Sequence, residues 1–237
     1  MDPVQAPGVY QGVANVIAAA MLLIEFGMLR QALARDQVRL YAAQSALISV
    51  LAIVIGADRN LPDLYALAAL SAALKVAAVP LMLRRLLGRA GAEGGDEEEP
   101  LGVAGSHRLS PASAVLAGIV LAAYGFFCFG ALGFQTRGIH GPAATISALA
   151  IAAAMVLVAF ELMIVRRDVA SQAIGFLALE NAISLAALVV AAGLPLILET
   201  AFLFDLLVAI VVFGMLIRAQ HTRAESLSTA DLTRLRG

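Results

Sequence analysis

The segment Ile174-Gly-Phe-Leu-Ala-Leu-Glu-Asn-Ala-Ile183 is apolar apart from Glu180 and Asn181, and it lies within a longer apolar run over residues 172–193. A run of about 20 apolar residues predicts a helix that crosses the hydrocarbon core of a membrane. A charge near the centre of such a helix disfavours insertion by roughly 2.5 to 3.5 kcal/mol, so it persists mainly where it faces a bundle interior. This stretch therefore predicts a membrane-spanning helix and makes Glu180 a candidate functional residue.

The composition of the whole chain agrees with a membrane location. Of its 237 residues, 61% are hydrophobic and only 14% are charged, and the mean hydropathy is +0.90. Such values lie far outside the range of water-soluble domains. A bilayer solvates apolar side chains directly and requires only that backbone groups bond within helices. We therefore expect an all-α, polytopic membrane protein.

Seven apolar runs of sufficient length follow one another along the chain. Polar and helix-breaking stretches separate them, such as Asp58-Arg-Asn-Leu-Pro62 and the turn Gly193-Leu-Pro195. We expect a single membrane domain over 1–237, with three N-terminal helices within 9–83 and four C-terminal helices within 112–217. The predicted spans are 9–29, 38–57, 62–83, 112–134, 142–165, 172–193 and 196–217. The first is too long for the apolar region of a signal peptide, so we expect a retained helix.

The arginines alternate between the connections in the way that the positive-inside rule predicts. The connections on one side hold thirteen arginines, and those on the other side hold two, Arg59 and Arg137. We expect the arginine-rich connections to be cytoplasmic, which places the N-terminus outside and a C-terminal tail, 218–237, inside. The thirteen are Arg30, Arg35, Arg39, Arg84, Arg85, Arg89, Arg108, Arg166, Arg167, Arg218, Arg223, Arg234 and Arg236.

One connection, 84–111, is long and contains the acidic, glycine-rich stretch Gly91-Ala-Glu-Gly-Gly-Asp-Glu-Glu-Glu-Pro100. This stretch has too little apolar surface to fold alone, so we expect a flexible cytoplasmic loop. Docking of the acidic residues within 93–99 to a basic partner, or guidance of cations to an entry point, is an alternative role.

The cysteine and histidine content excludes several kinds of chemistry. Cys128 is the single cysteine and lies in an apolar stretch, so neither a disulfide framework nor a cysteine-ligated iron-sulfur or nickel-iron centre is expected. His107, His140 and His221 fall in predicted connections or the tail, without metal-ligand spacing. We therefore expect no metal, no cofactor and no catalytic site of its own. We also expect no nucleic-acid partner.

Five acidic side chains and one lysine lie more than two residues inside the ends of the predicted spans. Glu180 and Asp205 lie nearest to mid-bilayer, and Lys75 lies about eight residues from the inner end of its span. Glu161 and Glu25 lie nearer the inner ends of theirs. The sixth residue, Glu199, lies near an outer end, and acids at such positions reach water or a neighbouring arginine more easily.

These residues have the chemistry of a proton relay. Burial favours the neutral form of an acid and a nearby cation favours its charged form, so a glutamate beside Lys75 is poised to exchange a proton. Asn181 and Ser184 lie on or near the face of Glu180, where they can hold bridging waters between more distant carboxylates. The alternative is that the charges form buried ion pairs that only fix helix register.

Several short motifs resemble a known family. Arg166-Arg-Asp168, Ile174-Gly-Phe-Leu-Ala-Leu-Glu-Asn-Ala182, a last span with an acid at its centre and the ending Leu232-Thr-Arg-Leu-Arg-Gly237 are similar to the membrane component E of hydrogenase-4, of the formate hydrogenlyase type. This likeness covers most of the chain. The last three helices, within the region 142–237, also resemble the K-type subunit of respiratory complex I and the C subunit of Mrp-type cation/proton antiporters.

The resemblance implies a non-catalytic membrane subunit that lies between antiporter-like membrane subunits and a redox arm of the nickel-iron hydrogenase type. It also implies that the subunit contributes protonatable groups to a central hydrophilic axis. Glu180 matches the first glutamate of the K-type helix by its Leu-Glu context. Asp205 is the better positional match to the second glutamate, and Glu199 is the alternative.

We therefore expect a subunit of the bacterial inner membrane that couples electron transfer in a partner to proton, or alternatively sodium, translocation. Two other functions stay open. One is a stand-alone carrier of a small cation that uses the same acids as ligands, and such carriers ordinarily show paired repeats or broken helices. The other is a structural membrane anchor in which the charges only pair with one another.

Overall fold

The computed structural model describes residues 9–31, 33–85, 110–131, 143–166 and 169–191, together with the single positions 208, 212 and 214. These residues form helices and no strand. Within these described ranges, six stretches are long and apolar enough to cross a membrane. The chain is therefore an all-α, multi-pass membrane protein. In chain order the elements are α1 (Val9–Arg30), α2 (Ala34–Arg59), α3 (Pro62–Ser71), η1 (Ala72–Ala78), α5 (Pro111–Ala131), α6 (Ala143–Val165) and α7 (Val169–Ala191).

The observed helices agree with the first six predicted spans to within a few residues. The third span is composite, because α3, η1 and the following helical residues together make one apolar stretch, Pro62–Arg85. The seventh predicted span, 196–217, lies outside the described residues except for Val208, Val212 and Gly214, which are helical. The count of seven therefore stays a prediction, as do the loop containing 93–99 and the tail, which also lie outside the described residues.

The turn between α2 and α3 forms where the sequence predicts a break. Asn60 adopts a left-handed backbone conformation with φ 53°, and its N–H donates to the carbonyl oxygen of Gly56, which closes the last turn of α2. Pro62 occupies the first turn of α3, where its missing N–H is not needed. The chain therefore reverses direction within three residues.

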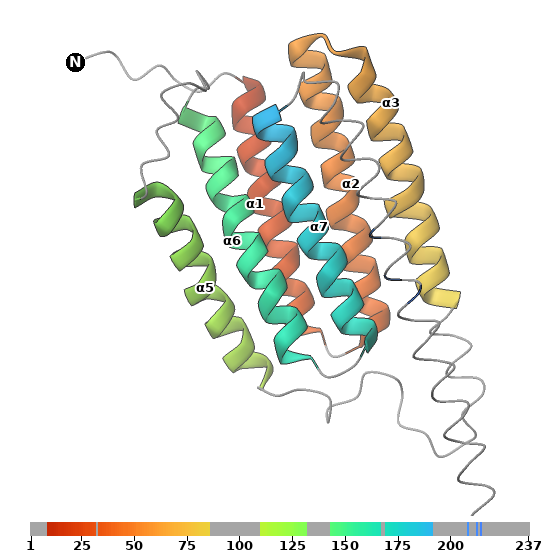
Figure 1. Cartoon of the computed structure of the whole chain (residues 1–237), viewed down its shortest axis with the longest axis vertical. Helices are drawn as coiled ribbons and strands as arrows, with labels where there is room; N and C mark the ends of the chain where they lie inside the picture. The colour runs from red at the N-terminus through yellow and green to blue at the C-terminus, as the bar shows by residue number, and fades with distance from the viewer. Residues whose placement is uncertain are drawn as a thin grey trace, which may run out of the picture.

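Figure 1 shows the helices side by side in one bundle. The inner group is α1, α2, α6 and α7, because α1 contacts α2 and α6, and α7 contacts the same two helices. On one flank α5 packs against α6, and on the other α3 packs against α2. The apolar stretch of α7 is 61% buried, whereas that of α5 is 22% buried. The midpoint of α7, where Glu180 lies, is thus within the bundle.

Close approach between helices depends on small residues, as the alanine-rich sequence of α6 predicts. Ala148, Ala150, Ala152 and Ala154 are all buried. A Cβ atom on Gly125 of α5 would lie 3.0 Å from the Cα atom of Ala154, so the two helices meet with almost no side chain between them.

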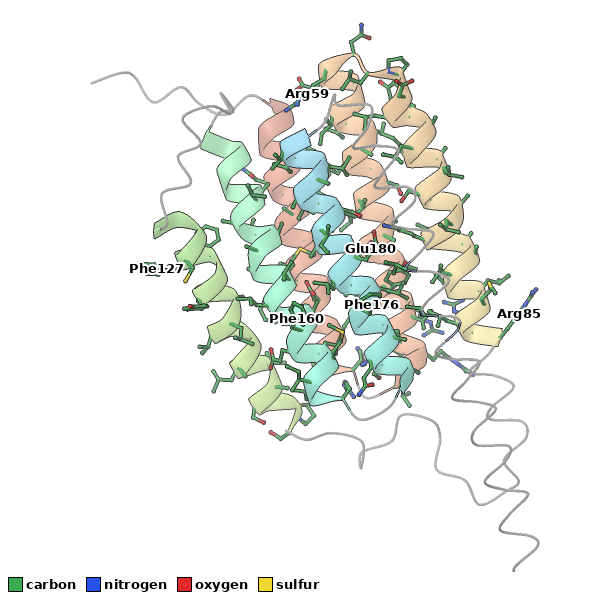
Figure 2. All side chains as sticks on the ribbon, in the orientation of Figure 1. Arg59, Arg85, Phe127, Phe160, Phe176 and Glu180 are labelled. Carbon is green, nitrogen blue, oxygen red and sulfur yellow. The ribbon has the colours of Figure 1, made fainter. Side chains whose placement is uncertain are left out.

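The described arginines gather at one end of the bundle, where α1 and α6 finish and α2 and α7 begin; we call this the arginine-rich end. Arg59 is the exception, and Figure 2 shows it at the opposite end from Arg85. This sorting is the one that the sequence predicts, and the side on which each end lies stays a prediction. The residues at the arginine-rich end are Arg30, Arg35, Arg39, Arg84, Arg85 and Arg166.

Large apolar side chains cover the outside of the bundle. Phe127 of α5 is 72% exposed and points away from the other helices (Figure 2), and Leu23 of α1 is 69% exposed. Such a surface suits contact with lipid acyl chains, and the polar groups of the spans turn inward.

Candidate functional site

Lys75 of η1 and Glu180 of α7 form a buried ion pair near the middle of their spans. The Nζ atom of Lys75 contacts Oε1 of Glu180, and the two side chains are 4% and 1% exposed. Glu180 is at the midpoint of α7, about 16 Å along the helix from Val169 at 1.5 Å per residue. The sequence predicts Glu180 inside the bundle and Lys75 as the counter-ion of either Glu180 or Asp205, and the structure pairs Lys75 with Glu180.

Ser184 completes a compact group with these two residues, which we call the triad. Its Oγ atom donates to Oε1 of Glu180 at 2.7 Å and lies 3.4 Å from Nζ of Lys75. Ser184 follows Glu180 by four residues, so one helical turn aligns the hydroxyl with the carboxylate. Because the contact is direct, Ser184 needs no bridging water to reach Glu180.

Lys75 is carried by a π-helical segment, Ala72–Ala78, in the middle of the third span. The N–H of Val79 donates to the carbonyl oxygen of Leu74, five residues earlier. Pro80 explains the wider turn, because a proline ring clashes with the carbonyl four residues before it, here that of Val76. Short π-helical segments are frequent at functional sites, where they re-aim a side chain.

Asn181 of α7 contacts α2. Its Nδ2 atom donates to Oε1 of Gln44 and to Oγ of Ser45, each at 3.0 Å. Gln44 in turn donates to the backbone carbonyl of Met21 in α1 at 3.4 Å. A chain of amide and hydroxyl groups therefore runs from α7 through α2 to α1, and it begins one residue from Glu180.

Glu25 and Glu161 are buried near the arginine-rich end of the bundle. Glu25 of α1 is 0% exposed and Glu161 of α6 is 5% exposed. Neither oxygen of either carboxyl group has a hydrogen-bond partner among the described residues. The sequence left open that such acids reach water or a neighbouring arginine; within the described part of the chain both are buried and neither pairs with an arginine.

Arg166, directly after α6, is buried at the arginine-rich end of the bundle. Its guanidinium donates to the backbone carbonyls of Leu29, at 3.2 Å, and of Gln31, and the residue is 1% exposed. Gln37 at the start of α2 donates to the carbonyls of Met28 and Gln31, each at 3.2 Å. These donors satisfy the last carbonyl groups of α1, which have no partners within the helix.

The other predicted site residues, Asp205 and Glu199, lie outside the described residues, as do His107, His140 and His221. Among the described residues, no group of three or more His, Cys, Asp or Glu side chains is placed to hold a metal ion.

The sequence reading missed the polar face of α2. Gln37, Tyr41, Gln44 and Ser45 are all 0% exposed. Their spacing of three to four residues within an otherwise apolar span was the available signal, since residues so spaced share one face of a helix. The sequence analysis considers uncharged polar residues only beside Glu180, although uncharged amides and hydroxyls elsewhere in a span also avoid lipid.

The fold and the triad define an α-helical, multi-pass membrane protein that buries an ion pair at mid-span. The sequence is similar to the uncharacterized protein Rv0085 of Mycobacterium tuberculosis (strain H37Rv), with 34% identity over 186 residues and 77% of each chain covered. The chain belongs to the same family as Rv0085. No family model matches the sequence, and no solved structure matches it significantly.

Proposed function

We propose that this chain is a non-catalytic subunit of a complex I-related redox complex, of the hydrogenase or formate hydrogenlyase type, in a bacterial inner membrane. Its intramembrane carboxylates contribute to proton translocation, or alternatively sodium translocation, coupled to electron transfer in a partner arm. The observation that carries this proposal is the triad, a buried lysine and glutamate in contact at mid-span with a hydroxyl beside them.

The triad has two charge-balanced states. In one, Lys75 is an ammonium and Glu180 a carboxylate; in the other, the proton has moved and both side chains are neutral. In a low-dielectric interior the neutral pair avoids the desolvation cost of two charges, so the two states lie closer in free energy than in water. The hydroxyl of Ser184 both donates and accepts, which lets it follow the proton.

Transport needs more than one such group along the membrane normal. The amide network from Asn181 to Met21 joins α7 to α1 at the depth of the triad, and Glu25 and Glu161 lie nearer the arginine-rich end. Moving one charge across a membrane takes roughly 2.3 kcal/mol per 100 mV, so this chain needs a redox partner to drive it. The resemblance to component E of hydrogenase-4 assigns that role to a nickel-iron hydrogenase-like arm with antiporter-like neighbours.

A structural membrane anchor is the second candidate, and one observation favours it. The contact between Lys75 and Glu180 is direct and buried, which is also the geometry of an ion pair that only holds helices together. An anchor requires the pair for assembly, whereas a relay requires it for proton movement.

The test is Glu180→Gln in the complex purified from native membranes. Glutamine keeps the shape of the side chain and removes the titratable group, so a relay assembles normally and its redox-driven proton uptake into vesicles falls roughly tenfold or more. Loss of assembly with Glu180→Gln favours the anchor. Unchanged proton uptake contradicts the relay, and purification without hydrogenase-like or antiporter-like subunits contradicts the proposed complex.

A further inference from the structure

Two buried acids stand apart from the triad. Glu25 precedes the last residue of α1, Arg30, by five residues, and Glu161 precedes the last residue of α6, Val165, by four. At 1.5 Å per residue both lie about 6 to 8 Å from the arginine-rich end, whereas Glu180 lies about 16 Å from the start of α7. The acids thus occupy a separate level of the bundle.

The described surroundings of Glu25 and Glu161 contain no group that balances a negative charge on either acid. Both side chains are at least 95% buried, and all four carboxyl oxygens are without a hydrogen-bond partner among the described residues. Glu180, by contrast, contacts an ammonium and a hydroxyl. A buried carboxylate without a cation or donor is strongly disfavoured, and taking up a proton is the least costly way to remove the charge.

Gly118 of α5 makes room for the carboxyl group of Glu161. A Cβ atom at position 118 would lie 2.8 Å from Oε2 of Glu161, 2.8 Å from Cδ1 of Leu29 and 3.2 Å from Cε1 of Phe26. The carboxyl group of Glu161 therefore ends at the contact between α5 and α1. Leu29 follows Glu25 by one helical turn, so the carboxyl group of Glu161 lies within about one turn of α1 from Glu25.

The register of α1 against α2 connects this level with the triad. Gln37 donates to the carbonyl of Met28, and Gln44 donates to that of Met21. These two bonds place the residues between them at equal depth on the two antiparallel helices, so Tyr41 is level with Ile24, one residue from Glu25. Tyr41 is fully buried. One turn further along α2, Gln44 accepts a hydrogen bond from Asn181, which is next to Glu180 in the sequence.

We propose that Glu25 and Glu161 form a second proton-binding site, occupied by at least one proton, which exchanges protons between the arginine-rich end and the triad along the face of α2 that carries Tyr41 and Gln44. The exchange of protons between this site and the triad rests on the proposed function. Proton occupancy of the site is independent of that function.

Occupancy is tested on the purified full-length chain with a hydrophobic carbodiimide, which adds covalently to neutral carboxylic acids buried in apolar surroundings. Mass spectrometry at neutral pH is expected to find the adduct on Glu25 or Glu161 and not on the exposed Asp63. Labelling of neither glutamate at neutral pH, with labelling only after acidification, overturns the proposal.

The variant Gly118→Ala tests where the carboxyl group of Glu161 lies. The added methyl group meets Oε2 of Glu161 and must displace it, so labelling of Glu161 is expected to change at least about twofold in rate, a modest barrier change. The control is Gly12→Ala in α1, where an added Cβ meets nothing within 4 Å. Equal labelling rates in both variants contradict the assigned position.

The connection to the triad is tested in the purified complex by redox-driven proton uptake. Glu161→Gln and Glu25→Gln are both expected to assemble, and at least one of them to lower uptake roughly tenfold. Normal uptake in both, with loss in Glu180→Gln, overturns the connection and leaves the proposed function in place. Normal uptake in Glu180→Gln with carbodiimide labelling of Glu161 contradicts the proposed function and leaves the proton site in place.

Discussion

Lys75 and Glu180 are 105 residues apart in the sequence, and the ammonium of one contacts the carboxylate of the other in the interior of the bundle. The contact joins the third span to α7, which are not neighbours in the chain. Its consequences for stability can be measured without any assumption about function.

We expect Lys75→Met to destabilise the chain by about 3 to 5 kcal/mol, because it removes the ammonium that contacts the buried carboxylate of Glu180. The double variant Lys75→Met with Glu180→Gln is expected to recover much of this loss, since it removes both charges. Thermal unfolding in detergent measures both effects. As a control, Arg39→Ala breaks the exposed pair with Asp36 and is expected to cost less than about 1 kcal/mol. Equal losses in the single and double variants would contradict the pairing.

Replacing Asn181 with leucine tests the amide network. The change removes the donor to Gln44 and Ser45, whose oxygens stay buried, and is expected to cost about 1 to 3 kcal/mol in unfolding free energy. Ser113→Ala, which removes an exposed hydroxyl on α5, is the control and is expected to change stability by less than about 0.5 kcal/mol. A loss as small for Asn181→Leu as for the control would show that the network contributes nothing.

Pro80→Ala tests the origin of the π-helical segment. Alanine supplies an N–H and removes the ring, so the backbone around Val76 can return to α-helical bonding, which turns Lys75 away from Glu180. We expect the coupling free energy between Lys75 and Glu180, from a double-variant cycle, to fall in the Pro80→Ala background. If the coupling is the same in both backgrounds, the proline does not set the position of Lys75.

Gly125→Ala is expected to weaken the contact between α5 and α6. A Cβ at position 125 would lie 3.0 Å from Cα of Ala154 and 3.2 Å from the carbonyl oxygen of Ala153, which are backbone atoms that cannot rotate aside. Overpacking of this kind costs typically about 1 to 3 kcal/mol, which a shift in thermal unfolding reports. The open site at Gly12 is again the control, and equal unfolding temperatures for the two alanine variants would contradict the observed helix contact.

Much of the candidate site followed from the sequence. Glu180 and Lys75 are recognisable because a charge in an apolar run is visible in consecutive residues, but depth alone left Asp205 as an equal partner for Lys75. The partners of Asn181 were not predicted, since uncharged polar residues such as Gln44 give only a weak signal in an apolar helix. The burial of Glu25 and Glu161 was also not predicted, because both lie near helix ends where acids often reach water.

The sequence by itself determined that this chain is helical, crosses the membrane several times and carries charges at particular depths. The reason is that run length and charge position are properties of one segment, and each helix satisfies its own backbone without help from its neighbours. Only the tertiary structure decided which groups meet: Lys75 with Glu180, Asn181 with Gln44, and Glu161 with the gap left by Gly118. These helices are apolar on nearly every face, so their rotation and relative depth come from packing between segments and are absent from the pattern of any one of them.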